Sequence, residues 1–232
     1  MSTASSAPYV RHITNPTDAE LSKLVDIFVE AFKDDPWGVP DRHAAQVLSA
    51  RPDGECVHGP TADERRPEVS AALGGYEGGV VSEDDLAEGT SALASTEARA
   101  AGWDQFIARL PAALRAWWQD CFSPAMKKLS LAALGVGGAH RAWHLLLFGV
   151  LPAHQGRGYG RVLVEHVGRL ASETHTPLVV ETGTETSVKI YTKLGFDVVR
   201  HIDLPSDYGD AHVWLLTKKP LQVASTYSNA RA

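Results

Sequence analysis

The stretch LLLFGVLPAHQGRGYGRVL, from Leu145 to Leu163, decides the fold. An apolar run ends at Pro152, three glycines follow at alternate positions, and a helical pattern begins at once. Glycine has no Cβ, so the backbone there can adopt positive φ values and bring several N–H groups close to one ligand. These groups lie where a helix begins, and Arg157 and Arg161 add positive charge. The stretch therefore predicts a strand, an anion-binding loop and a helix.

Three kinds of glycine-rich turn connect a strand to a helix, and their spacing distinguishes them. A nucleoside triphosphate loop ends in Gly-Lys-Ser/Thr, whereas Gly160 is followed here by Arg161. A dinucleotide-binding turn needs a third glycine where Arg161 stands, although Glu181 resembles its downstream acidic residue. A nucleotide-dependent oxidoreductase and a turn without any ligand therefore stay open as alternatives to the third kind.

The third kind of turn is carried by two segments. Gln155–Gly160 (QGRGYG) resembles the Q/R-x-x-G-x-G/A signature of the GNAT superfamily of acetyl-CoA-dependent N-acetyltransferases. Ile190–Phe196 (IYTKLGF) resembles the I/L-Y-x-K-L-G-F segment of the same family, in the expected order and spacing. The resemblance covers about the last 80 residues well and the first helix loosely. It implies a mixed α/β fold, with a mostly antiparallel central sheet, splayed fourth and fifth strands and flanking helices.

The resemblance also implies acetyl-CoA as the cofactor and assigns residue roles. The Tyr191 hydroxyl is expected to protonate the departing thiolate, and the Val150 N–H is expected to polarise the thioester carbonyl. Ser187 occupies a position where the family more often has asparagine. The residues expected to contact the cofactor are Phe148, Gly149, Val150, Gln155, Gly156, Arg157, Gly158, Tyr159, Gly160, Arg161 and Ser187.

The base that deprotonates the acceptor amine has two candidates. Glu181 ends a predicted strand and is the base we assign, together with Tyr191 as the second catalytic residue. His144 competes with it, and strict alternation places His144 on the same strand face as Phe148. A histidine in a strand is more often packed and hydrogen-bonded than catalytic. No H-E-x-x-H motif or Cys/His cluster is visible, so no metal is expected.

The amino-terminal part predicts a strand followed by a helix. Tyr9–Thr14 is expected to be the first strand. Thr17 and Glu20 have the capping-box spacing, a hydroxyl at the cap and a carboxylate three residues on. Apolar residues then recur at helical spacing as far as about Asp34–Pro36. In the resembling family, this first helix borders the acceptor site.

The segment 37–140 is predicted to be atypical, helical or irregular. Pro67–Leu73 is expected to form a short helix, and only Val80–Val81 has a visible strand pattern. Members of the family place two or three long antiparallel strands in this part of the chain. The sheet is therefore expected to be short or incomplete.

Three helices are predicted before the fourth strand, ending at Gly135. They carry Trp103, Trp117 and Trp118, which either line the acceptor pocket or pack in the core. Core packing is favoured because aromatic residues at helical spacing bury well. The last third predicts a parallel βαβ unit followed by strands, with these elements: strand 142–150, helix to about 174, strand 178–181, helix 185–194 and an antiparallel pair at 196–204 and 212–217.

Composition limits the range of functions. The 232-residue chain has a formal net charge of -6, which argues against nucleic-acid or membrane binding as its main activity. Cys56 and Cys121 lie far apart and are expected to be reduced thiols. The amino terminus lacks the pattern of a secretory signal, so a cytoplasmic protein is expected.

These observations predict one enzyme. A single acetyltransferase domain is expected at 9–220, between mobile tails at 1–8 and 221–232. It is expected to move the acetyl group of acetyl-CoA directly to a primary amine of a small molecule or peptide, as a monomer or homodimer. The alternative is a catalytically impaired CoA-binding protein with a degenerate acceptor side. The acceptor itself is not identified by any motif.

Overall fold

The fold is a seven-stranded sheet with helices on both faces, as the computed structural model shows for residues 10–13, 17–33, 54–58, 69–75, 103–207 and 209–220. The strand order is β1-β2-β3-β4-β5-β7-β6. Only β4 and β5 are parallel, and every other neighbouring pair is antiparallel. The strands are β1 (Arg11–Ile13), β2 (Gly54–His58), β3 (Val69–Gly75), β4 (Trp143–Val150), β5 (Leu178–Thr182), β6 (Asp197–Leu204) and β7 (Ala211–Lys218).

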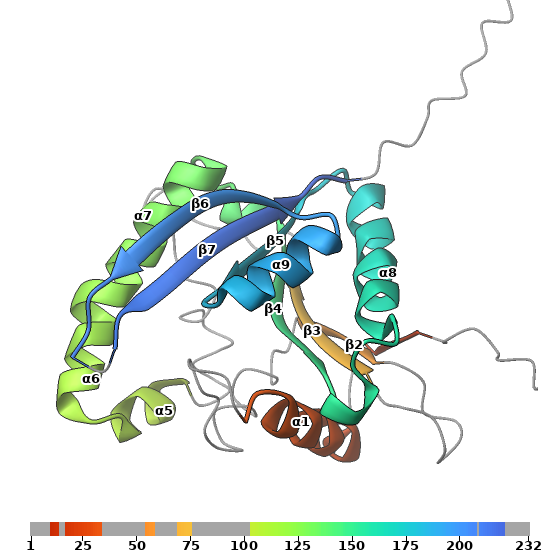
Figure 1. Cartoon of the computed structure of the whole chain (residues 1–232), viewed down its shortest axis with the longest axis horizontal. Helices are drawn as coiled ribbons and strands as arrows, with labels where there is room; N and C mark the ends of the chain where they lie inside the picture. The colour runs from red at the N-terminus through yellow and green to blue at the C-terminus, as the bar shows by residue number, and fades with distance from the viewer. Residues whose placement is uncertain are drawn as a thin grey trace, which may run out of the picture.

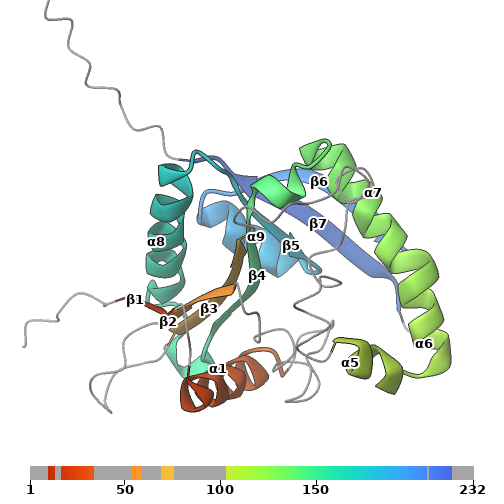
Figure 2. The ribbon, with the colours of Figure 1, turned by 180° about the vertical axis from the view of Figure 1, so that it is seen from behind.

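The helices form two layers around this sheet. On one face lie α8 and α9, and on the other lie α1 and α7 (Figures 1 and 2). This arrangement confirms the expected mixed α/β sheet with flanking helices. The α-helices are α1 (Asp18–Ala31), α5 (Trp103–Arg109), α6 (Ala112–Trp117), α7 (Ser123–Leu134), α8 (Tyr159–Glu173) and α9 (Glu185–Lys193). None of the helices in the described part of the chain is long and apolar enough to cross a membrane.

The predicted helix at Pro67–Leu73 is wrong, because Val69–Gly75 forms β3 and pairs with both β2 and β4. β2, at Gly54–His58, was not predicted either. The run VSAALGG has small residues and glycines in place of β-branched alternation, so its pairing with neighbouring strands overrides its weak local preference. The expected strand pattern at Val80–Val81 lies outside the described residues.

The first helix begins as the sequence predicts. Thr17 accepts from the Glu20 N–H at 3.3 Å, and the Glu20 carboxylate accepts from the Thr17 N–H at 2.8 Å. α1 then buries Leu24 and Phe28 against β4. It ends at Ala31, whereas the predicted end at 34–36 lies outside the described residues.

A bulge in β4 overturns the simple alternation expected for this strand. The pairing of β4 with β3 shifts at Leu146, which has no partner in the register. Leu145 and Phe148 consequently both pack with α8, while Leu147 packs with α1. His144, on the face opposite Leu145, therefore does not share a face with Phe148. One extra residue is enough to exchange the two faces beyond it.

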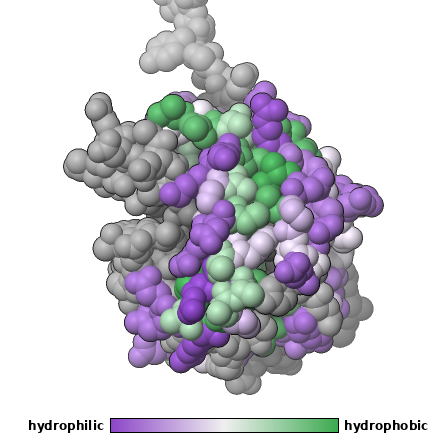
Figure 3. Space-filling view, turned by 90° about the vertical axis from the view of Figure 1, so that its left-hand side faces the viewer, coloured by the Kyte–Doolittle hydropathy of each residue, from purple (hydrophilic) through white to green (hydrophobic). Residues whose placement is uncertain are grey.

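The helices before β4 pack as a core. A π-helical turn, Trp118–Phe122, joins α6 to α7. The Trp117 Nε1 donates to the Pro205 carbonyl at 2.8 Å, and the Trp118 and Phe122 rings lie 4.5 Å apart. Both tryptophans contact the cluster under β6 and β7, which supports core packing, and the Trp103 side chain lies outside the described part. On the face of the molecule that Figure 3 shows, hydrophilic residues lie between the hydrophobic ones.

The gap between β4 and β5 positions the site. The two strands pair only at Trp143 with Leu178 and at His144 with Val179. β4 then continues to Val150 and β5 to Thr182, and the two strands do not pair with each other beyond this point. The expected splay of the fourth and fifth strands is confirmed.

Candidate active site

The loop between β4 and α8 has the conformation that its glycines predict. Gly156 has φ 74° and Gly158 has φ 85°, both in the left-handed region that glycine adopts readily. No atom lies within 4 Å of a Cβ built at either position, so the space beside the loop is open. Gly160 differs, because a Cβ there would meet Phe148 Cζ at 2.7 Å. The loop thus leaves room on its outer side while α8 begins directly against β4.

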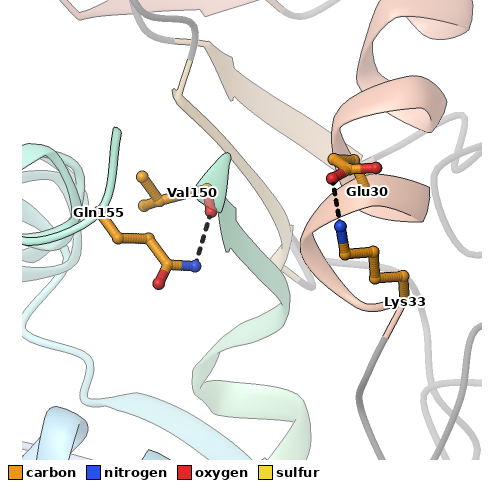
Figure 4. A network of polar contacts seen from close by, with 4 residues as sticks. All are labelled: Glu30, Lys33, Val150 and Gln155. Atoms are coloured by element: carbon orange, nitrogen blue, oxygen red, sulfur yellow. Dashed lines mark hydrogen bonds and ion pairs between the residues drawn. The ribbon is translucent and has the colours of Figure 1, made fainter. Parts of the chain in front are cut away.

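The start of α8 presents unsatisfied donors to this space. Its N-cap is Gly158, which supplies no side-chain cap, so the first N–H groups of the helix have no intrahelical partner. The Gln155 Nε2 donates to the Val150 carbonyl at 3.1 Å and ties the loop back to the end of β4 (Figure 4). Such a helix start favours an anion such as a phosphate.

The two arginines of this region lie in different surroundings. Arg157 is exposed in the loop. Arg161 Nη2 instead donates to the Lys193 carbonyl at 3.2 Å, and its Nη1 lies 4.0 Å from Glu165. Arg161 therefore connects the start of α8 with the end of α9, and Arg157 is the better placed cation for a ligand in the loop.

Tyr191 of α9 lies beside the gap between the strands. Tyr191 is 9 % exposed, and its ring centroid is 6.1 Å from that of Phe148 and 5.5 Å from that of Phe196. Two cations hold the carboxyl end of this helix. Arg161 is one of them, and the other is Lys218, whose Nζ donates to the Leu194 carbonyl at 2.7 Å. Positive charge at this end of a helix interacts favourably with the helix dipole.

The two base candidates, Glu181 and His144, lie together. His144 Nε2 is 3.1 Å from Glu181 Oε1, and their side chains are 10 % and 24 % exposed. His144 belongs to the last paired position of β4 with β5, so the pair lies where the two strands begin to diverge. Burial raises the pKa of the Glu181 carboxyl, but the charge and hydrogen bond of His144 outweigh burial and hold this pKa below its usual value.

Comparison with known proteins finds a family likeness in one part of the chain. Residues 127–198 match the family model of the acetyltransferase (GNAT) domain. This segment runs from α7 into β6 and includes the glycine loop, Glu181 and Tyr191, so the likeness to the family covers the candidate site.

Solved GNAT structures share this fold along most of the chain. The histone acetyltransferase HPA2 and related acetyltransferase of Corynebacterium glutamicum is 20 % identical, with a TM-score of 0.51 over 94 % of this chain and 99 % of that one. A GNAT-family protein of Desulfovibrio desulfuricans is 16 % identical, with a TM-score of 0.53 over 93 % of this chain and 100 % of that one. The ribosomal-protein-S18-alanine N-acetyltransferase of Escherichia coli is 12 % identical, with a TM-score of 0.50 over 95 % and 99 %.

The structure places the predicted site residues in different surroundings. The loop residues, Phe148 and Tyr191 gather around the splayed strands, and Glu181 lies at the base of the splay. The Ser187 hydroxyl accepts from Thr184 Oγ1 at 2.8 Å at the start of α9. Thr184, the N-cap of α9, was missed, although a threonine just before a helix is a recognisable cap signal.

Proposed function

We propose that the chain is an N-acetyltransferase that moves the acetyl group of acetyl-CoA directly to a primary amine. The observation that carries this proposal is the divergence of β4 from β5 beyond His144, with the glycine loop at one end of β4 and the Glu181–His144 pair at the other. Diverging strands between an anion site and a half-buried carboxylate suit a thioester arm and an attacking amine.

The residues of the loop fit acetyl-CoA. The N–H groups at the start of α8, with Arg157 beside them, would hold the pyrophosphate, because the backbone at Gly156 and Gly158 leaves open space there. Phe148, Gly149 and Val150 would contact the pantetheine arm along the part of β4 that no longer pairs with β5. The cofactor supplies an activated acetyl thioester, and the chain supplies binding, orientation and proton transfer.

The chemistry then needs a base, a polarising group and an acid. The Glu181 carboxylate accepts a proton from the acceptor ammonium through water, which frees the amine lone pair to attack the thioester carbonyl. The Val150 N–H stabilises the negative charge that develops on the carbonyl oxygen. As the C–N bond forms and the C–S bond breaks, the Tyr191 hydroxyl gives its proton to the departing thiolate. The second proton of the nitrogen then returns through water to the Tyr191 oxygen, which leaves a neutral amide.

His144 acts in this scheme as a positioning residue for Glu181. Its hydrogen bond fixes the carboxylate at the base of the splay and keeps it ionised against the effect of burial. An ionised carboxylate is required of a base near neutral pH. The acceptor that we propose is a small molecule or peptide with a primary amine, and the domain that performs the reaction spans residues 9–220, as a monomer or homodimer.

Isothermal titration with acetyl-CoA tests the cofactor half of the proposal, and release of free CoA thiol across a panel of amines tests the transfer. We expect saturable binding and amine-dependent thiol release. Absence of binding at millimolar acetyl-CoA would overturn both halves. Binding without thiol release would instead favour the catalytically impaired CoA-binding protein, whose main motivation, the apparent lack of strands before β4, is weakened by β2 and β3.

Tyr191→Phe separates catalysis from binding. The substitution keeps the ring between Phe148 and Phe196 and removes only the hydroxyl. We expect kcat to fall by about 100-fold or more, the usual effect of a lost general acid, while the Kd for acetyl-CoA stays the same. An unchanged kcat would remove Tyr191 from the acid role.

A further inference from the structure

A cluster of two histidines and an aspartate lies on the β6–β7 hairpin, away from the Glu181–His144 pair. His201, Asp203 and His212 are all exposed, and one ligand atom from each lies within 4.8 Å of the other two. Asp203 pairs directly with His212 across the two strands, and His201 lies two residues before Asp203 on β6. The three side chains therefore project from the same face of the hairpin.

The distances within the cluster are short. Asp203 Oδ1 lies 3.0 Å from His201 Nε2 and 2.6 Å from His212 Nδ1. Both imidazoles thus converge on one carboxylate oxygen. Four-coordinate zinc holds its ligands at about 2.0–2.1 Å, so neighbouring ligand atoms lie about 3.3 Å apart. An ion between them would lengthen these two contacts by about 0.3 and 0.7 Å.

The backbone and a stacked ring hold these side chains in place. The pairing of β6 with β7 runs from Asp197 to Leu204 and includes all three residues or their partners. The His201 ring stacks on Trp214, its partner on β7, with centroids 4.4 Å apart and an angle of 17° between the planes. Trp214 in turn packs against the core under α8 and α9. A ligand set built on paired strands loses little conformational freedom when it binds an ion.

We propose that His201, Asp203 and His212 form a binding site for one divalent cation of the zinc class. Two imidazole nitrogens and a carboxylate oxygen suit Zn²⁺, whereas Mg²⁺ and Ca²⁺ prefer oxygen ligands throughout. The side chains of the three residues are 37 %, 64 % and 50 % exposed, so the remaining coordination position faces solvent. A linear motif does not reveal this site because its ligands come from two strands.

The ion would stabilise the end of the hairpin next to the active-site strand. Trp214 pairs with Thr182, the residue after Glu181 in β5. A cation that ties β6 to β7 at this level therefore tightens the strand that supports Glu181. The site is separate from the cofactor loop, and its occupancy can be measured without any acetyltransferase assay.

Titration of the metal-free, tag-free full chain with ZnCl₂ tests the proposal. We expect one Zn²⁺ per chain by calorimetry, and a visible absorption band when Co²⁺ replaces Zn²⁺. Asp203→Asn and His212→Gln should each weaken Zn²⁺ binding by about 100-fold or more, since even residues behind the ligands change metal affinity by about 10–100-fold. Asp197→Asn is the matched control, because it removes an exposed carboxylate from the opposite end of β6.

Thermal unfolding gives a second, independent measurement. Zn²⁺ should raise the Tm of the unmodified chain and of Asp197→Asn, because an ion that binds only the folded state stabilises it. It should leave the Tm of Asp203→Asn unchanged. Equal Zn²⁺ affinity in the unmodified chain and Asp203→Asn would overturn the proposal and assign the binding to other residues. Zn²⁺ binding that Mg²⁺ displaces at equal concentration would contradict the ligand chemistry.

Discussion

Removing the His144 imidazole tests how the half-buried carboxylate of Glu181 is kept ionised. His144→Leu keeps an apolar side chain of similar bulk at this buried position and deletes the contact at 3.1 Å. A hydrogen bond to a charged group contributes about 1.5–3 kcal/mol, and this contribution favours the ionised carboxylate. We therefore expect the pKa of Glu181 to rise in His144→Leu, because His144 no longer offsets the effect of burial.

The assay is the pH dependence of kcat at saturating acetyl-CoA. Because the base must be ionised, the acidic limb of the profile should move to higher pH in His144→Leu, while the plateau at high pH is retained. Glu181→Gln should lower the plateau itself by about 100-fold or more. Glu173→Gln, which removes an exposed carboxylate at the end of α8, should change neither.

Two results would refute this reasoning. If Glu181→Gln keeps its plateau, the carboxylate is not the base. If His144→Leu lowers the plateau as strongly as Glu181→Gln, without a shift of the limb, then His144 itself carries the proton. The free energy of unfolding should also depend on pH. A carboxyl whose pKa is lowered in the folded state stabilises that state above its unfolded pKa. This contribution of Glu181 is lost as the pH falls through its folded pKa.

Two further substitutions test the loop and the helical layer. Gly158→Ala places a side chain on a left-handed backbone, which costs about 1–2 kcal/mol of conformational free energy. The loop should then hold its conformation less well, and calorimetry should show weaker acetyl-CoA binding. Gly168→Ala, a helical position with no atom within 4 Å of the added Cβ, should leave binding unchanged, and equal effects would contradict the role of the loop. Trp117→Phe removes the donor to Pro205 and should cost about 1 kcal/mol, lowering the Tm by about 2–4 °C. An unchanged Tm would show that this contact is not stabilising.

The last third of the fold and the start of α1 could be predicted because their signals are local. Gly195 has φ 90° directly after α9, as expected for a glycine that ends a helix. Gly156 and Gly158 mark their loop for the same reason, since glycine alone adopts these dihedral angles without strain. The Thr17 cap depends on atoms three residues apart. In each case, the sequence neighbours contain the whole physical cause.

The parts that were missed depend on residues distant in sequence. β3 is a strand because β2 and β4 flank it, and nothing within Val69–Gly75 itself requires this. The pairing of His144 with Glu181 joins residues 37 positions apart across a parallel strand pair. The sequence indicates His144 and Glu181 as two competing candidates for the base. Only the structure shows that the two side chains are in contact.

The bulge at Leu146 makes the length of β4 a sensitive variable. Deleting one residue there would restore plain alternation, and every later side chain of the strand would change face. The Phe148 ring would then turn toward α1, where Gly149 now has so little room that a Cβ would lie 3.1 Å from Ala31 Cβ. Substitutions along β4 that conserve its length should consequently be tolerated far better than a single deletion, and insertions belong in the loops outside the strand.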